Sequence, residues 1–83
     1  MKNIVMVDKV GPCRTGTLYN VNYKHIVDVL GEPNAQDDPD KVRWSWGFEV
    51  DGVYCGIWDY KGSGDYMQWS TFGPDDVIAG LFN

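Results

Sequence analysis

The sequence has few of the residues that build catalytic, metal-binding or disulfide-bonded sites. Its 83 residues include two cysteines, Cys13 and Cys55, and one histidine, His25. Two cysteines without metal-ligand spacing predict neither a zinc site nor a disulfide framework. A nucleophilic enzyme would need His25 beside one of them, and Cys55 falls in a predicted core strand, where cysteine is usually an inert small hydrophobe. The sequence therefore favours a protein without catalytic activity, metal or cofactor.

Basic residues and long apolar runs are also scarce. Seven Lys and Arg against twelve Asp and Glu give a net charge of −5. This charge argues against direct binding of nucleic acid through its phosphates and is compatible with a partner protein that has a basic surface. The N-terminal apolar run from Ile4 to Val7 is broken by Asp8, so neither a signal peptide nor a membrane span is predicted. We expect a cytoplasmic protein of one domain, residues 1–83.

The most informative stretch, residues 41–60, predicts a β-hairpin. Apolar and polar residues alternate from Val42 to Val50, Asp51 and Gly52 fit a two-residue type I′ turn, and a second β-branched and aromatic run ends at Tyr60. Because the turn sets the register, it decides which residues share each face of the sheet. The hairpin therefore provides the starting point for the predicted fold.

The predicted register divides the hairpin between two faces. The core face takes the pairs Val50 with Val53, Phe48 with Cys55, Trp46 with Ile57 and Trp44 with Asp59. The second face takes Glu49 with Tyr54, Gly47 with Gly56, Ser45 with Trp58 and Arg43 with Tyr60. The paired glycines predict either a notch in the second face or a bulge or tight twist of the strands.

The other segments predict two further strands and two helices. Residues 2–10 predict a first strand, and residues 66–72 predict a strand that continues the hairpin as a meander. Residues 13–19 fit either a loop or a short extension of the sheet. Helix 23–30 begins after the N-cap Asn22 and stops at Gly31, and Pro74 opens a last helix.

The element order β-α-β-β-β-α predicts the fold class. It indicates a two-layer α+β domain with an antiparallel sheet of three to four strands and helices packed on one face. The helices are expected to cover the core face, with Trp44, Trp46, Phe48, Ile57 and Trp69 beneath them.

Two groups of side chains are candidates for binding a partner. The acidic group is Asp37, Asp38 and Asp40 in a polar loop and Asp75 and Asp76 at the start of the last helix. The loop lacks the ligand positions of an EF-hand, so no calcium site is predicted. The aromatic group, expected on the second sheet face, is Arg43, Tyr54, Trp58, Tyr60 and Tyr66. An exposed aromatic patch would indicate an interaction surface, whereas cover from Leu18, Tyr19 or the first strand would make it a second small core.

Several motifs resemble a group of small bacteriophage proteins of mostly unassigned function. They are Leu-Gly-Glu-Pro at 30–33, the tryptophan-rich strand, Ile-Trp-Asp-Tyr-Lys at 57–61 and Trp-Ser-Thr-Phe-Gly at 69–73, and together they span about two-thirds of the chain. The resemblance implies a role in the contest between phage and host, in which small acidic proteins act as inhibitors, anti-CRISPR proteins among them. It implies no particular catalytic or binding residues.

Three hypotheses for function follow. The first is a non-catalytic inhibitor in the host cytoplasm that uses its acidic group to bind a basic host-defence or nucleic-acid-binding protein. The alternative is a small-molecule sponge, whose aromatic face, alone or doubled in a homo-oligomer, stacks a nucleotide signal while Arg43 pairs with phosphate. An enzyme is the third, and the sequence offers no catalytic residues for it.

Overall fold

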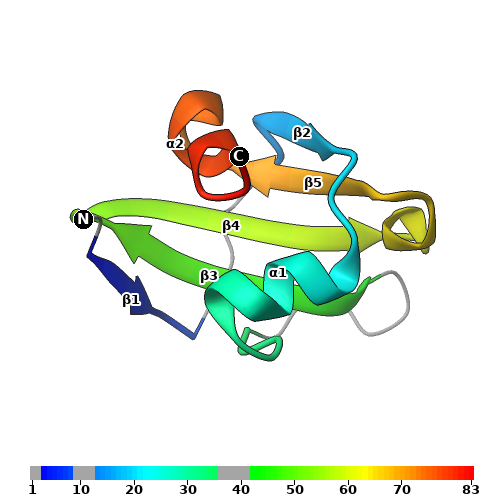
Figure 1. Cartoon of the computed structure of the whole chain (residues 1–83), viewed down its shortest axis with the longest axis horizontal. Helices are drawn as coiled ribbons and strands as arrows, with labels where there is room; N and C mark the ends of the chain where they lie inside the picture. The colour runs from blue at the N-terminus through cyan, green and yellow to red at the C-terminus, as the bar shows by residue number, and fades with distance from the viewer. Residues whose placement is uncertain (1–2, 9–12, 36–41) are drawn as a thin grey trace.

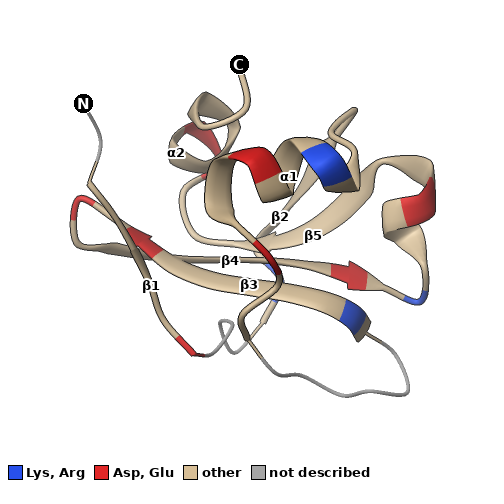
Figure 2. Ribbon diagram, turned by 60° about the horizontal axis from the view of Figure 1, so that its bottom comes forward, with Lys and Arg blue, Asp and Glu red and all other residues tan. Residues whose placement is uncertain are grey.

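The computed structural model describes residues 3–8, 13–35 and 42–83. These residues form a five-stranded antiparallel sheet and two α-helices (Figure 1). Along the chain the elements are β1 (Ile4–Met6), β2 (Gly16–Tyr19), α1 (Tyr23–Leu30), β3 (Val42–Val50), β4 (Val53–Tyr60), the 3-10 helix η1 (Ser63–Tyr66), β5 (Gln68–Phe72) and α2 (Asp75–Gly80). The strand order across the sheet is β1-β3-β4-β5-β2, and both α-helices lie over one face (Figure 2).

The predicted α+β class is confirmed, but the sheet has five strands where three to four were predicted. The additional strand is β2, from the segment that fitted either a loop or an extension of the sheet, and its Leu18 lies opposite Trp69 of β5. The predicted helix 23–30 is confirmed. The last strand begins at Gln68 rather than residue 66, because Ser63–Tyr66 turns into η1. Residues 2, 9 and 10 of the predicted first strand lie outside the described residues.

The β3–β4 hairpin has the predicted register from its turn as far as Ser45, which lies opposite Trp58. Beyond that point the register shifts, and Val42 rather than Arg43 lies opposite Tyr60. Arg43 and Trp44 therefore both face Asp59, which is the two-against-one arrangement of a β-bulge. The predicted pair of Arg43 with Tyr60 is therefore wrong, and Trp44 shares Asp59 with Arg43 instead of pairing with it alone.

A buried carboxylate stabilises the bulge. Asp59 has no exposed surface. Its Oδ1 accepts hydrogen bonds from the backbone N of Arg43 at 3.0 Å and of Trp44 at 2.9 Å, and its Oδ2 accepts one from Arg43 Nε at 2.9 Å. Both amides that the bulge removes from regular pairing are thereby satisfied, which buried backbone groups require.

The core lies between the sheet and the two helices. Four of the five residues expected there, Trp46, Phe48, Ile57 and Trp69, are fully buried. The fifth, Trp44, is partly buried, and its ring lies 4.5 Å from that of Tyr23 on α1.

Two tryptophans of the sheet hold α1 at both of its ends. Trp69 Nε1 donates a hydrogen bond of 2.6 Å to the carbonyl of Val21, just before the helix. Trp46 Nε1 donates one of 2.9 Å to the carbonyl of Gly31, just after it. The two rings meet edge to face with centroids 5.5 Å apart. Asn22 caps the same helix, with its Oδ1 accepting from the backbone N of His25 at 2.8 Å.

Gly64 in η1 packs directly against the ring of Trp69. A Cβ at Gly64 would lie 2.6 Å from Cη2 and 2.9 Å from Cζ3 of Trp69, and 3.0 Å from Cβ of Asp59. The Trp69 ring cannot move aside without breaking its bond to Val21. A side chain at this position therefore has no space.

We expect Gly64→Ala to lower the free energy of unfolding by about 1–3 kcal/mol, the usual cost of inserting a methyl group into a packed core. Urea unfolding followed by tryptophan fluorescence measures the loss. Ser63→Ala is the matched control in the same turn, because the Ser63 hydroxyl oxygen is buried without a hydrogen-bond partner. Its removal should leave stability within ~0.5 kcal/mol. Equal stability of Gly64→Ala and the unaltered protein would contradict the close packing.

Candidate functional site

The sheet face opposite the helices carries a row of side chains that crosses four strands. Ser45 lies opposite Trp58, Trp58 opposite Ser70, and Ser70 opposite Thr17. Their neighbours along the strands point into the helix-covered core, so alternation directs this row to the other face. Three of the four side chains are small, and the surface beside Trp58 is correspondingly hollowed.

Two adjoining hollows open on this face. Their volumes are about 160 and 260 Å³, and Arg14, Tyr60 and Ser70 line both of them. The larger also includes Trp58, and the lining of the smaller also includes Thr17, Tyr19, Ser63 and Gln68. Because they share these residues, we treat them together as the Arg14 hollow. Strands β2, β4 and β5 all contribute to it, so the fold and not a single segment forms the site.

Arg14 is the only Lys or Arg among the described residues that line either hollow. It forms no ion pair with any described residue. The walls are aromatic, formed by Tyr19, Trp58 and Tyr60. Tyr60 and Tyr19 keep 43% and 59% of their surface exposed, whereas Trp58 keeps 8%. The remaining groups are hydroxyls and an amide, which hydrogen-bond without charge. The site therefore combines one cation with aromatic rings and neutral donors.

The structure brings together part of the predicted aromatic group. Tyr54, Trp58 and Tyr60 alternate along β4 on the helix-free face, and the Tyr54 ring lies 5.6 Å from that of Phe72. Trp58 and Tyr60 meet in the Arg14 hollow, but Trp58 is buried. Tyr66 is apart from this face, because it belongs to η1, where it is 79% exposed.

Leu18, named as a cover for this patch, instead belongs to the helix-side core, and Tyr19 is exposed. The face is thus buried at Trp58 and open at Tyr60.

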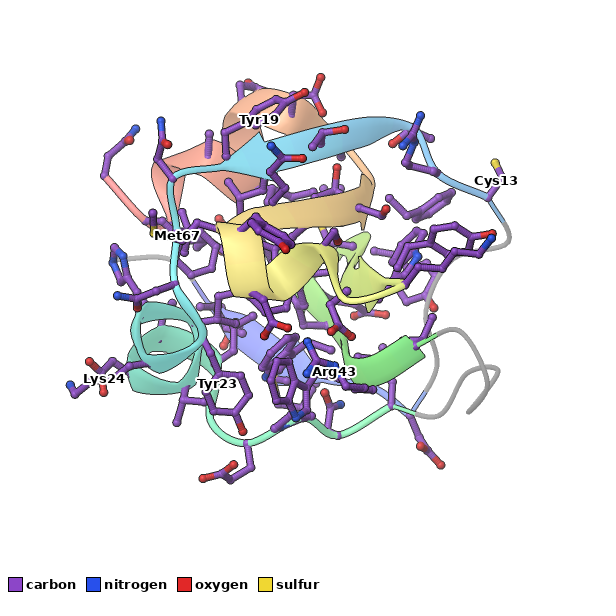
Figure 3. The ribbon with its side chains drawn as sticks, turned by 90° about the vertical axis from the view of Figure 1, so that its right-hand side faces the viewer. Cys13, Tyr19, Tyr23, Lys24, Arg43 and Met67 are labelled. Atoms are coloured by element: carbon purple, nitrogen blue, oxygen red, sulfur yellow. The ribbon has the colours of Figure 1, made fainter. Side chains whose placement is uncertain are left out.

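Arg43 does not face this surface, contrary to the predicted register. Its Nη2 lies 2.9 Å from Asp59 Oδ2 and 3.0 Å from Asp65 Oδ1, at the end of the molecule that Figure 3 shows. Hydrogen bonds to Asp65 and then to Asp59 raise the pKa of Arg43, so its guanidinium stays charged. The ring of Trp44 lies 4.2 Å from its Cζ. The charge of Arg43 is therefore used to balance the carboxylate that holds the bulge.

Arg14 is the functional candidate that the sequence analysis missed. It lies in the segment that could not be assigned to a strand or a loop, so neither its face nor its neighbours could be predicted. The available signal was indirect: a lone arginine among Cys13, Thr15 and Thr17 has no nearby acid in sequence to pair with.

In Figure 2 acidic residues (red) lie at the β3–β4 turn, on the adjoining end of β3 and on α2, and others lie on α1, β4 and η1. Glu49 and Asp51 belong to the hairpin, and Asp75 and Asp76 to the first turn of α2. We call these four residues the acidic end. Helix α2 begins beside the hairpin because Gly73 approaches it closely: a Cβ there would lie 3.0 Å from the Tyr54 carbonyl oxygen.

None of the four acids forms an ion pair with a described residue. The other acids of the predicted group, Asp37, Asp38 and Asp40, lie outside the described residues.

The residues considered for catalysis make ordinary packing contacts. The His25 ring meets Phe82 edge to face at 5.4 Å and, among the described residues, makes no hydrogen bond to either cysteine. Cys55 is fully buried, and burial raises the pKa of its thiol. Within residues 3–8, 13–35 and 42–83, no three His, Cys, Asp or Glu side chains come together as a metal site. In the same residues, no helix has the length and apolar character needed to cross a membrane.

Comparisons with known proteins supply no relatives. No protein-family model matches the sequence, and searches of curated proteins and of solved structures find no significant match.

Cys13 is exposed whereas Cys55 is buried, so the two thiols should differ sharply in reactivity. At about pH 8 a thiol reagent should label Cys13 rapidly and Cys55 only after unfolding, because burial both blocks Cys55 and disfavours its thiolate. A colorimetric thiol assay should count one fast-reacting group in the native protein and two in urea. Cys13→Ser should remove the fast phase. Two fast groups in the native protein would contradict the burial of Cys55.

Proposed function

We propose that this protein is a non-catalytic interaction protein that binds a basic surface of a partner protein through its acidic end. The partner class that fits is a host-defence or nucleic-acid-binding protein, because proteins that bind phosphates carry basic surfaces. The resemblance to small phage proteins supports an inhibitor acting in the host cytoplasm. The observation that carries the proposal is that the four acids of the acidic end form no ion pair with any described residue.

Two of the four described cations pair with acids away from the acidic end. Lys24 lies 2.8 Å from Asp28 on α1, and Arg43 pairs with Asp59 and Asp65 near η1. The four acids of the acidic end lack such partners among the described residues. With no described cation to neutralise them, these acids give their end of the molecule a negative potential, which salt screens.

The placement of these acids suits fast, reversible association. Asp51, Asp75 and Asp76 are exposed, and Glu49 is partly buried. Rim charges of this kind raise association rates and fix orientation more than they add affinity, and their effect weakens as salt rises. The net charge of −5 acts in the same direction at longer range.

A charge-neutralised variant tests this proposal. The tagged full chain is used to recover partners from host lysate in low salt, and the recovered proteins are identified by mass spectrometry. We expect a basic nucleic-acid-binding or defence protein, with recovery falling as salt is raised. Asp75→Asn with Asp76→Asn should reduce its association rate at low salt by about tenfold or more, as loss of steering charges does.

The control makes the same change of net charge elsewhere. Asp8→Asn with Asp28→Asn also removes two negative charges, but from outside the acidic end, and should leave partner recovery nearly unchanged. Because Asp75 and Asp76 stabilise the start of α2 by about 0.3–1 kcal/mol each, urea unfolding must show that the test variant remains folded. Equal recovery by the two double variants, or recovery of no basic protein, would reject the proposal.

A further inference from the structure

We propose that the Arg14 hollow is a binding site for a small ligand that combines one planar ring with one phosphate group, of the class of the nucleoside monophosphates. The site lies on the sheet face away from the helices, and its lining contains none of the four acidic-end residues. It therefore does not depend on the protein–protein contact proposed above.

The phosphate would bind Arg14. A guanidinium presents a planar fork of donors that matches two phosphate oxygens, and it stays charged at every physiological pH. Arg43 has this chemistry too, but its guanidinium is already bound to Asp59 and Asp65. Arg14 has no such acid among the described residues, so its donors remain available.

The ring would lie against the tyrosines. Tyr60 lines both hollows, and Tyr19 lines the smaller one. Their exposed rings offer faces on which a base can stack, and stacking contributes about 1–3 kcal/mol per base in other proteins. Lys61 Nζ lies 5.4 Å from the centroid of the Tyr60 ring, which places a second cation next to the hollow but outside its lining. Trp58, which is buried, forms an apolar base for the larger hollow.

The remaining lining residues suit the edge of a base or a sugar. Ser70, Thr17 and Gln68 can each donate and accept hydrogen bonds. The hydroxyl oxygen of Ser63, which also lines the smaller hollow, is buried without a hydrogen-bond partner. An unsatisfied buried hydroxyl next to a hollow is a polar group that a ligand or water can pair.

Size and charge limit the ligand to one phosphate. Even taken together, hollows of about 160 and 260 Å³ are only as large as a small ligand pocket, for which roughly 300–1,000 Å³ is typical. A single arginine lines them in a protein of net charge −5, so each further phosphate adds repulsion that no lining cation offsets. A nucleoside triphosphate should therefore bind more weakly than the corresponding monophosphate.

Titration calorimetry on the full chain, with AMP, GMP, CMP and UMP as probes, tests the site. At least one of the four should bind with a dissociation constant below about 1 mM. Adenosine should bind at least about tenfold more weakly than AMP, because it lacks the phosphate. Inorganic phosphate should bind at least about tenfold more weakly than the best monophosphate, because it lacks the ring. ATP should bind more weakly than AMP. Amide shifts in NMR spectra should concentrate on β2, β4 and β5.

Two variants separate the contributions of the cation and the ring. Arg14→Gln should weaken monophosphate binding by about tenfold or more, the loss expected for a charge-assisted bidentate contact. Lys24→Gln removes the same charge from α1 and should leave affinity unchanged. Tyr60→Ala should weaken the monophosphate but not inorganic phosphate. Urea midpoints check that each variant is folded.

Several results would overturn the inference. Absence of binding by all four monophosphates at 5 mM, a concentration about five times the expected limit, would reject the site. Equal losses for Arg14→Gln and Lys24→Gln would show a nonspecific charge effect. If inorganic phosphate binds as tightly as the best monophosphate, the ring makes no contribution. If ATP binds more tightly than AMP, the limit to one phosphate is wrong. None of these outcomes bears on partner binding by the acidic end.

Discussion

The contact between Trp46 and Trp69 is the constraint on which the rest of the structure depends. Each indole ring is buried under the helices, and each N–H hydrogen-bonds a carbonyl at one end of α1. Buried tryptophans need such partners, because an unpaired indole N–H in a core is costly. A helix of eight residues is marginal by itself. It forms here because its two ends are fixed to β5 and β3, two strands of one sheet. The same ring of Trp69 requires glycine at position 64, so η1 also takes its path from this contact.

A second constraint decides which cations remain available for binding. The buried Asp59 carboxylate holds the bulge in β3, and a buried charge of this kind requires an opposite one. Arg43 supplies it, and in doing so turns away from the helix-free face. Arg14, in contrast, lies on that face and forms no ion pair with a described acid. Because Arg43 neutralises Asp59 inside the hairpin, Arg14 is the arginine that lines the hollow on the other face.

Local sequence signals predicted the parts of the fold that depend on neighbours along the chain. The Asp51-Gly52 turn placed Trp46 opposite Ile57, and Asn22 and Gly31 marked both ends of α1. The errors came from contacts that are distant in sequence. Strand β2 exists because Leu18 pairs with Trp69, 51 positions later. Its own four residues, Gly16–Tyr19, begin with a glycine and give only a weak strand signal. The bulge depends on a carboxylate that reaches across from β4, which alternation of apolar residues cannot reveal.

The same distinction explains why only Trp58 and Tyr60 of the candidate site were predicted. Trp58 and Tyr60 lie on one strand, so alternation alone put them on a common face. Arg14 joins them only because β2 pairs with β5, which in turn pairs with β4. In a small domain many polar side chains are needed to stabilise the fold itself. Here Asp59 and Arg43 stabilise the hairpin, and Asn22 caps a helix. Both binding sites that we propose therefore use charges without an ion pair to a described residue: the acids of the acidic end and the arginine on the open face of the sheet.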